Sequence, residues 1–422
     1  MSPQAADVES LIDVNEEVAN GGMSSTTGGR GGRGHGISVH VTTFNCANSP
    51  HPLFPIAFPS SPPDLLVLGL QELAPAHIAF LNLPVIEDLY LKGIESVADI
   101  ARKHYGKEYE LVKVVRIGQT ALIVWSSLGA RLRKVQTAWA GCGVFGLLAN
   151  KGAAATRLTV LDGTSNLVNF LMIDSGALRE VTFVAAHLAA REGHFYRRNA
   201  DFQSLVQNLV FQDRTGIFKP HTPLFFLGDL NYRLSVLHPS RSGTRLTISP
   251  DESHEDEHSL ITLLTENILD FIETGKFTNL VRHDQLPLSP LALHLNEAPI
   301  TFGPTYKYLS HDPPTYTTTR TPSWTDRILF SPESLLTKDY RSSMCATFSD
   351  HQAVCLEAVL RKQDFAEEDG VMPWDINPAW RGRREFAERL GYAVGAMEFM
   401  GMTKVGVMVL AILLSGMALY FY

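Results

Sequence analysis

The sequence predicts an α/β fold in which one large domain, residues 37–360, is followed by a further apolar helix. Two observations carry this prediction. Short apolar segments rich in leucine and β-branched residues recur through the domain, as in strands that are covered on both faces. Helical patterns lie between them, most clearly over 193–211. The expected strands are 37–45, 65–71, 111–116, 122–126, 154–161, 181–187, 224–229, 326–330 and 353–360.

Length and composition suit a folded protein. The chain has 422 residues, of which 45% are hydrophobic and 19% are charged. The formal net charge of −8 argues against binding to nucleic acid over the whole surface, and we expect no nucleic-acid partner. The cysteines show no C-x-x-C spacing, so we expect reduced core thiols and no disulfide-linked partner. They are Cys46, Cys142, Cys345 and Cys355.

Residues 1–36 are expected to form a disordered, glycine-rich tail. Residues 1–20 contain acidic but no basic side chains, unlike a secretory signal. Eight glycines lie within 21–36, where too little apolar surface is available to offset the entropy of ordering the chain.

A connector is expected over residues 361–404. Within it, residues 379–400 place apolar side chains at roughly helical spacing, with arginines between them. Two interpretations are open: an amphipathic helix that lies on a membrane surface, or a helix that packs against the preceding domain. Gly391 and Gly395 weaken either helix.

Residues 405–422 contain no charged side chain. Eighteen residues in a helix span about 27 Å, close to the roughly 30 Å of a bilayer core. Tyr420 and Tyr422 lie at one end, where interfacial aromatic residues are common. We therefore expect a transmembrane tail anchor, with residues 1–404 in the cytoplasm and the endoplasmic reticulum or another endomembrane as its location.

Polar side chains fall at the ends of the expected strands, where functional groups can project into a cleft. Carboxylates, amides and imidazoles suit phosphate-ester hydrolysis assisted by Mg²⁺, which prefers oxygen ligands. The sequence has no G-x-x-x-x-G-K-[ST] loop for nucleotide-driven transfer, and attack by an activated water is expected. These strand-end residues are Asn45, Glu72, His187, Asp229, Asn231, Asp326, Asp350 and His351.

Seven short motifs occur in an order that resembles the inositol polyphosphate 5-phosphatases. They are TFN at 43–45, QE at 71–72, NKG at 150–152, HLAA at 187–190 with RRN at 197–199, FLGDLNYR at 226–233, PSWTDRIL at 322–329 and SDH at 349–351. The resemblance covers 37–360 and implies a two-sheet sandwich flanked by helices, as in deoxyribonuclease I.

The resemblance also implies roles for individual residues. Glu72 would be the principal Mg²⁺ ligand, with Asn45 beside it and Asp350 sharing the ion. Asp229 would orient and deprotonate the attacking water, and Asn231 would hold that water or the phosphate.

The remaining roles concern phosphate binding. His351 would contact the phosphate while Asp326 fixes its other ring nitrogen. His187 would be a second phosphate contact. Asn150 and Lys151 would lie close to the substrate.

Substrate choice in this family also depends on the phosphate at ring position 4. Tyr306, Lys307 and Arg320 resemble the residues that contact it. Thr318 stands where the pattern usually has a lysine, so one cation of that pocket is missing.

These observations lead us to expect Mg²⁺-dependent hydrolysis of the 5-phosphate of phosphatidylinositol 4,5-bisphosphate by a membrane-anchored enzyme. Three alternatives remain open. They are a soluble inositol 1,4,5-trisphosphate 5-phosphatase, another hydrolase of the same superfamily such as a nuclease or sphingomyelinase, and a non-enzymatic membrane tether.

Overall fold

The computed structural model describes residues 36–49, 58–81, 84–161, 178–234, 284–309, 315–317, 319–332, 335–343, 348–361, 374–402 and 408. The expected glycine-rich tail lies outside these residues except for Gly36, and so does the expected membrane span over 405–422 except for Met408. Within the described part of the chain, no helix is long and apolar enough to cross a membrane.

One six-stranded sheet has the order β13-β14-β1-β2-β4-β3. Its centre is the parallel pair β1 and β2, and the other neighbouring strands are antiparallel. The strands are β1 (Ser38–Asn45), β2 (Leu65–Gln71), β3 (Glu110–Ile117), β4 (Thr120–Ser126), β13 (Leu335–Ser343) and β14 (Ala353–Leu360).

The second six-stranded sheet has the order β5-β6-β7-β8-β12-β9. It repeats the plan of the first, because the parallel pair β7 and β8 lies among antiparallel neighbours. Its strands are β5 (Leu132–Gly141), β6 (Gly152–Leu161), β7 (Leu178–His187), β8 (Leu224–Asp229), β9 (Asn296–Glu297) and β12 (Asp326–Phe330). A separate hairpin joins β10 (Tyr308–Leu309) and β11 (Thr315–Tyr316).

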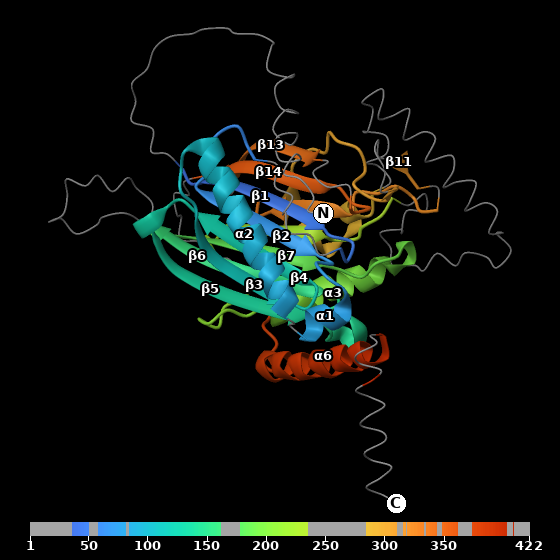
Figure 1. The fold of residues 1–422 in the computed structure, drawn as a ribbon. Coiled ribbons are helices and arrows are strands. Elements are labelled where there is room, and N and C mark those ends of the chain that lie inside the picture. Colours follow the sequence, from blue (N-terminus) through green and yellow to red (C-terminus); the bar gives the residue numbers. More distant parts are fainter. Residues whose placement is uncertain are drawn as a thin grey trace, which may run out of the picture. The chain divides into compact units, whose positions relative to one another are not determined.

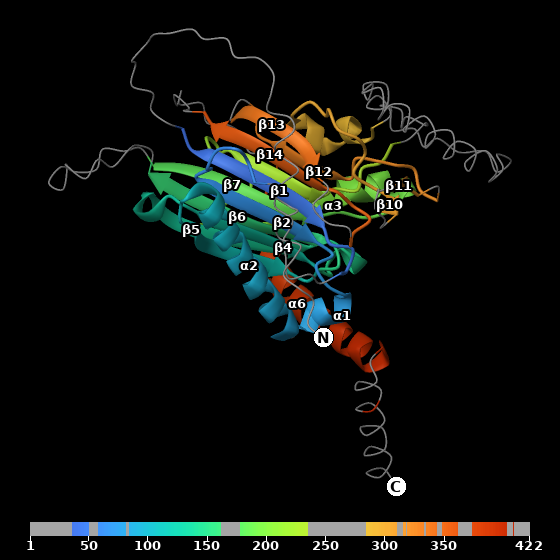
Figure 2. The same ribbon diagram turned by 45° about the horizontal axis from the view of Figure 1, so that its top comes forward.

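The two sheets stack face to face, as Figures 1 and 2 show. Side chains from both inner faces form one apolar core that includes Val41, Val67, Phe183 and Leu227. The sheets approach closely at Gly69, where an added Cβ would lie 2.8 Å from Leu227 Cδ1. The expected two-sheet sandwich is therefore confirmed.

Helices cover the outer faces of the sandwich (Figure 1). Apolar residues of α1 (Ala76–Leu81) and α2 (Pro84–Tyr105) pack on the β1-β2-β4 side. Those of α3 (Phe195–Asn208) pack on the β6-β7-β8 side. Short 3-10 helices complete the connections: Gly129–Arg131, Val144–Gly146, Glu192–His194, Leu286–Leu288 and Pro290–Leu293.

A long helix, α6 (Trp380–Met402), occupies the part expected to be a connector. It packs beside α1, as Figures 1 and 2 both show, and also contacts β5. Of the two interpretations of this segment, the contacts correspond to a helix docked on the preceding domain.

The expected strands all form, and the described residues contain five more: β5, β9 and β13 at sheet edges, and the hairpin strands β10 and β11. Both β5 and β13 end the order of their sheets. An edge strand faces solvent on one side, so its sequence carries polar residues in place of a continuous apolar run. The sequences LRKVQTAWAG and LLTKDYRSS show this composition.

Candidate active site

Strand register brings the functional side chains to one edge of the sandwich. Asp229, the last residue of β8, pairs with His187 at the end of β7 and with Asp326 at the start of β12. In the other sheet, Asn45 at the end of β1 pairs with Gln71 at the end of β2. Because parallel strands end at the same edge and antiparallel strands begin there, polar groups from these five strands converge.

Gly228 allows β8 to lie close enough to β7 for this pairing. Its φ is +144°, and an added Cβ would stand 1.8 Å from the Ala186 carbonyl oxygen. A residue with a side chain could take this conformation only by displacing the neighbouring strand. The glycine before Asp229 therefore supports the position of the carboxylate.

Two site residues just beyond the ends of buried strands have left-handed backbone conformations: Glu72 directly follows β2, and Asn231 lies two residues after β8. Glu72 has φ +47° and Asn231 has φ +57°. Such conformations are uncommon for residues other than glycine and concentrate where a side chain must be aimed. Here they turn both side chains toward the edge where the strands end.

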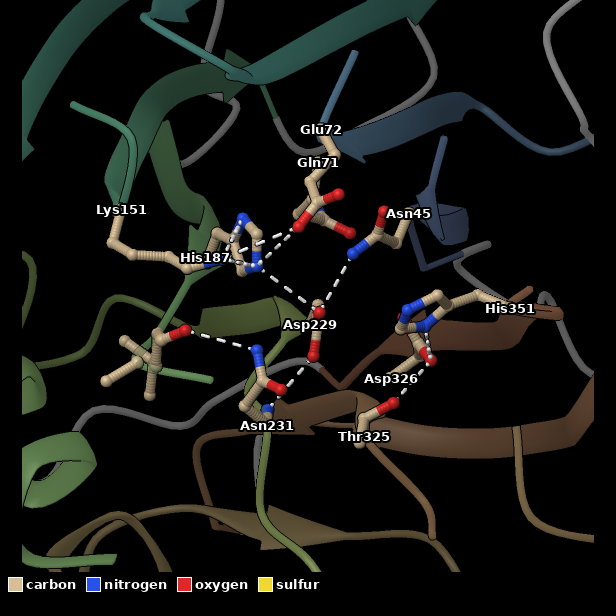
Figure 3. A network of polar contacts seen from close by, with 12 residues as sticks. Asn45, Gln71, Glu72, Lys151, His187, Asp229, Asn231, Thr325, Asp326 and His351 are labelled. Carbon is tan, nitrogen blue, oxygen red and sulfur yellow. Dashed lines mark hydrogen bonds and ion pairs between the residues drawn. The ribbon is translucent and has the colours of Figure 1, made fainter. Parts of the chain in front are cut away.

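Asp229 lies at the centre of the polar network (Figure 3). The Asn45 Nδ2 donates a hydrogen bond to Asp229 Oδ2 over 2.9 Å, and His187 Nε2 lies 3.3 Å from the same oxygen. The Asn231 backbone N–H donates to Asp229 Oδ1 over 3.1 Å, while its side-chain Nδ2 donates to the Leu188 carbonyl. The carboxylate is thus fixed from both sheets.

Lys151 and Glu72 complete the network on the other side of His187. The Lys151 ammonium contacts the His187 ring, with Nδ1 3.2 Å away, and lies 3.6 Å from Glu72 Oε1. Glu72 Oε1 is also 3.8 Å from His187 Nε2. The ammonium also contacts Nε2, more closely than Nδ1, and Nε2 faces Asp229 Oδ2 as well, so Lys151 and Asp229 meet at the same ring nitrogen.

The electrostatics of these groups follow from burial and contact. Burial and the Lys151 charge lower the pKa of His187 below its ordinary value, which keeps the ring neutral. Burial also lowers the pKa of Lys151, although Glu72 and Asp229 oppose this. Burial by itself would raise the pKa of Asp229, but the hydrogen bond to His187, with the charges of His351 and Lys151, holds it well below its usual range. Asp229 is therefore an anion at neutral pH.

A second acid–imidazole pair stands beside Asp229. The His351 Nδ1 lies 2.9 Å from Asp326 Oδ2, and the same oxygen accepts hydrogen bonds from the hydroxyls of Thr305 and Thr325 over 2.8 and 2.9 Å. Burial disfavours a charged ring, but the Asp326 carboxylate outweighs it and raises the pKa of His351 to about 9. His351 is therefore a cation at neutral pH, next to the anionic Asp229.

Aromatic and cationic groups border this pair. The Tyr306 ring lies 4.5 Å from the His351 ring, centroid to centroid, and the Arg233 guanidinium lies over the Tyr306 ring, 4.4 Å from its centroid. Arg233 also donates a hydrogen bond to Asn231 Oδ1. Tyr306 is thereby connected to both His351 and Asn231.

The other expected site residues occupy the margin of the site. Asp350 Oδ2 pairs with Lys307 Nζ over 2.9 Å, and its Oδ1 lies 3.9 Å from His351 Nε2. Arg320 is exposed, and its charge opposes the rise that Asp350 causes in the pKa of Lys307. Asn150 Oδ1 accepts a hydrogen bond from the Val144 N–H over 3.2 Å, which places Asn150 in a loop beside Lys151.

Several carboxylates could hold a metal ion. The ligand atoms of Asp229, Asp326 and His351 lie within 4.8 Å of one another. In this trio Asp326 and His351 are already paired with each other. On the other side of Asp229 lie Glu72 and Asn45. The Glu72 side chain is 27% exposed to solvent. Oxygen donors from Glu72, Asn45 and Asp229 fit a hard cation such as Mg²⁺ or Ca²⁺.

The structure adds supporting residues that the strand-end pattern did not reveal. Asn48 donates to Glu72 Oε2 over 2.7 Å, and Gln119 donates to Asn48 Oδ1 over 2.6 Å. Ser349 donates to the Asn45 carbonyl over 2.6 Å. Some of the supporting residues belong to the sequence motifs described above, namely Thr325, Ser349 and Arg233. The other two, Asn48 and Gln119, lie in loops that contain none of these motifs.

A hollow of about 620 Å³ opens next to Lys151. It lies between the 143–151 segment and the start of α3. Its lining includes Asn150, Lys151, Arg191, His194 and Arg197.

Comparison with known proteins places this geometry in a family. Residues 42–357 match the model of Endonuclease/Exonuclease/phosphatase family 2. The chain is 27% identical over 307 residues to the type II inositol 1,4,5-trisphosphate 5-phosphatase of Mus musculus. It is 29% identical over 314 residues to the polyphosphatidylinositol phosphatase INP53 of Saccharomyces cerevisiae. The matches cover 69% and 72% of this chain and about a quarter of each relative, 26% and 24%.

A solved structure shares the fold. The inositol polyphosphate 5-phosphatase domain of SpSynaptojanin, in complex with inositol (1,4)-bisphosphate and calcium ion, superposes with a TM-score of 0.57 at 22% identity. The superposition covers 86% of this chain and 91% of that domain. With a family match over most of its length and inositol 5-phosphatases among its relatives, the chain belongs to Endonuclease/Exonuclease/phosphatase family 2.

Proposed function

We propose that this protein hydrolyses the 5-phosphate of phosphatidylinositol 4,5-bisphosphate, giving the 4-phosphate. The observation that carries the proposal is the fixed Asp229 carboxylate, held by Asn45 and His187 beside a charged His351. Such an anion can orient an attacking water, and the cation beside it can stabilise the charge of a phosphate. The names of the relatives, which are inositol phosphate and phosphoinositide phosphatases, agree with this substrate class.

Asp229 would act by positioning the water more than by strong basicity. Its lowered pKa makes it a weak base, but a largely dissociative phosphoryl transfer demands little proton removal before the transition state. Its Oδ1 and Oδ2 are held by Asn231 and Asn45, so the carboxylate has little freedom to turn. The water would give its proton to this carboxylate as the new P–O bond forms.

Two cations would balance the charge of the substrate. His351 carries a proton on each ring nitrogen at neutral pH, so Nδ1 donates to Asp326 and Nε2 is available for a phosphate oxygen. Lys151, at 3.6 Å from Glu72, provides a second positive group on the opposite side of Asp229. Both groups are held by neighbours before substrate binds, which lowers the reorganisation needed in the transition state.

A divalent ion fits the oxygen donors of Glu72, Asn45 and Asp229, and we propose Mg²⁺ as the natural cofactor. When bound, such an ion neutralises a phosphate oxygen and stabilises the departing inositol oxygen. Asp350 is paired with Lys307 at 2.9 Å, which favours a role at the margin of the headgroup pocket over direct metal ligation. Tyr306, Lys307 and Arg320 would then face the 4-phosphate.

We also propose that residues 405–422 anchor the enzyme in an endomembrane. The run has no charge and is long enough to span a bilayer. The thiols of Cys46 and Cys142 are free and buried, which agrees with a reducing compartment such as the cytoplasm for the catalytic domain. Attachment to the membrane would raise the effective concentration of lipid substrate over soluble inositol phosphates.

A phosphate-release panel with the full chain tests the proposal. The substrates are phosphatidylinositol 4,5-bisphosphate in vesicles, soluble inositol 1,4,5-trisphosphate, DNA and sphingomyelin. We expect phosphate from the first two, with the higher kcat/KM for the lipid, and no cleavage of the two diesters. Cleavage of DNA or sphingomyelin without release of inositide phosphate would contradict it. Alkaline carbonate extraction of membranes tests the anchor separately, since release of the protein would contradict membrane spanning.

A further inference from the structure

The C-terminal helix α6 contacts a loop that forms part of the active-site rim. The family match ends at residue 357, so Trp380–Met402 lies outside the family domain. Arg383, in the first turn of α6, donates a hydrogen bond to the Gly146 carbonyl and lies 3.4 Å from Ser204 of α3. We define the rim loop as residues 143–148, which include Gly146.

The rim loop is connected directly to two site residues. The Val144 N–H donates to the Asn150 side chain over 3.2 Å, and the Gly143 N–H lies 3.2 Å from the Lys151 carbonyl oxygen. Gly143 and Asn150 are so close that an added Cβ on Gly143 would lie 2.0 Å from Asn150 Oδ1. A shift of this loop would therefore move Asn150 and Lys151 with it.

Two arginines hold the rim loop from different helices. Arg197 of α3 donates to the carbonyls of Cys142 and Gly143 over 2.8 and 2.9 Å. Arg383 of α6 holds the far end of the loop at Gly146. Between these points Phe145 is 81% exposed, so its own side chain contributes little packing that could fix the loop.

The position of α6 itself is determined by several contacts. The Arg384 guanidinium stacks 4.4 Å from the Trp139 ring centroid and donates to the Val210 carbonyl over 3.2 Å. At the other end, Gly395 lies so close to α1 that an added Cβ would be 2.7 Å from Phe80 Cβ. The glycines that weaken the isolated helix therefore form its contact face with α1, with Gly391 also facing Phe80.

We propose that α6 is a positioning element for the active site, and that Arg383 transmits its position to Lys151 through the rim loop. The proposal rests on the 5-phosphatase function proposed above. It differs from a flexible tether, because a tether would leave catalysis on a soluble substrate unchanged when its contacts are removed.

The test uses the full chain and soluble inositol 1,4,5-trisphosphate, so that membrane attachment does not enter the comparison. We expect Arg383→Ala to lower kcat/KM about tenfold, the order of one lost charged hydrogen bond. Arg383→Lys, which retains a donor, should recover most of the loss. Arg389→Ala, at an exposed arginine of the same helix, is the matched control and should retain the kinetics of the wild type.

Amide hydrogen exchange supplies a second readout. Arg383→Ala should raise exchange locally over 143–148 while the strands of the core keep their protection. Gly395→Ala, which pushes α6 from Phe80, should have the same local effect, whereas Gly382→Ala, with no neighbour within 4 Å of its added Cβ, should not.

The two readouts separate failure of this proposal from failure of the proposed function. If wild type releases no phosphate from the soluble substrate, the function fails, while exchange still decides whether α6 fixes the rim loop. Unchanged exchange over 143–148 in Arg383→Ala overturns the proposal. So does an active wild type whose kcat/KM is unaffected by Arg383→Ala.

Discussion

Asn45 in one sheet donates a hydrogen bond to Asp229 in the other over 2.9 Å. This contact joins the ends of β1 and β8 at the edge where the functional side chains gather. It supports the ionised form of Asp229, because the amide N–H can only donate and the carboxylate accepts. Residues from both sheets of the sandwich therefore stabilise the ionised form of the Asp229 carboxylate.

Replacing Asn45 should weaken catalysis through Asp229. Asn45→Ala removes a donor to the ionised carboxylate, so the pKa of Asp229 should rise toward its ordinary value. We expect the acid limb of the pH–rate profile to move to higher pH, with a loss in kcat of roughly tenfold to a hundredfold. A profile with its acid limb unmoved and kcat unchanged would show that the hydrogen bond has no catalytic role.

The charge of His351 should define the alkaline limb of activity. With its pKa raised to about 9 by Asp326, His351 should lose its proton and its donor capacity to phosphate as the pH passes that value. Asp326→Asn removes the carboxylate that contributes most to the raised pKa, while Asp229 and Asp350 still favour the charged ring, so the alkaline limb should move to lower pH. NMR titration of the His351 ring in both proteins measures the shift directly, and equal pKa values would refute the assignment.

The same pair should make stability depend on pH. The folded-state pKa of His351, about 9, exceeds its ordinary value of 6.5, so its stabilising contribution is complete below pH 6.5 and is lost as the pH rises through 9. We expect the difference in unfolding free energy between wild type and His351→Gln to shrink from pH 6 to pH 10. Urea unfolding at both pH values measures it, and a difference that grows with pH would have the wrong sign.

Glu72 should control metal dependence. Glu72→Gln keeps the size of the side chain but removes its charge, so the Mg²⁺ concentration for half-maximal activity should rise about tenfold to a hundredfold. Glu110→Gln, at an exposed position at the start of β3, is the matched control and should leave the titration unchanged. If the half-saturating Mg²⁺ concentration were the same in wild type and Glu72→Gln, Glu72 would not be a ligand of the metal ion.

Gly228 should be essential for the position of β8. Gly228→Ala introduces a Cβ 1.8 Å from the Ala186 carbonyl at φ +144°, so we expect a loss of about 3 kcal/mol or more in unfolding free energy. Gly193→Ala has no neighbour within 4 Å of its Cβ and should change stability little. Guanidinium unfolding of both variants provides the comparison. Equal unfolding free energies of Gly228→Ala and Gly193→Ala would mean that β7 and β8 can move apart without loss of stability.

The sequence predicted the strands in which apolar residues are dense, the edge strand β3 among them, and with them the residues at or after their ends. Asp229 and His187 could be placed together because each is the last residue of such a strand. The longer edge strands β5 and β13 were not predicted, since solvent on one side permits residues such as Lys134 and Asp339 there, and the two-residue edge strand β9 was not predicted either.

Contacts between distant loops could not be predicted in the same way. Asn48 reaches Glu72, and Gln119 reaches Asn48, through backbone turns with no periodic pattern. The docking of α6 depends on Gly395, which by helix propensity alone counts against a helix. Only the close approach of Phe80 explains why a glycine is suitable there.

Phosphate release from phosphatidylinositol 4,5-bisphosphate by the Asp229→Asn variant tests the central claim most directly. The substitution keeps the shape of the side chain but removes the negative charge and one acceptor that would orient and deprotonate the water. We predict a fall in kcat of about a thousandfold or more, with far-ultraviolet circular dichroism unchanged and phosphatidylinositol 4-phosphate as the wild-type product. Phosphate release within threefold of wild type by a folded Asp229→Asn protein would contradict the proposed mechanism.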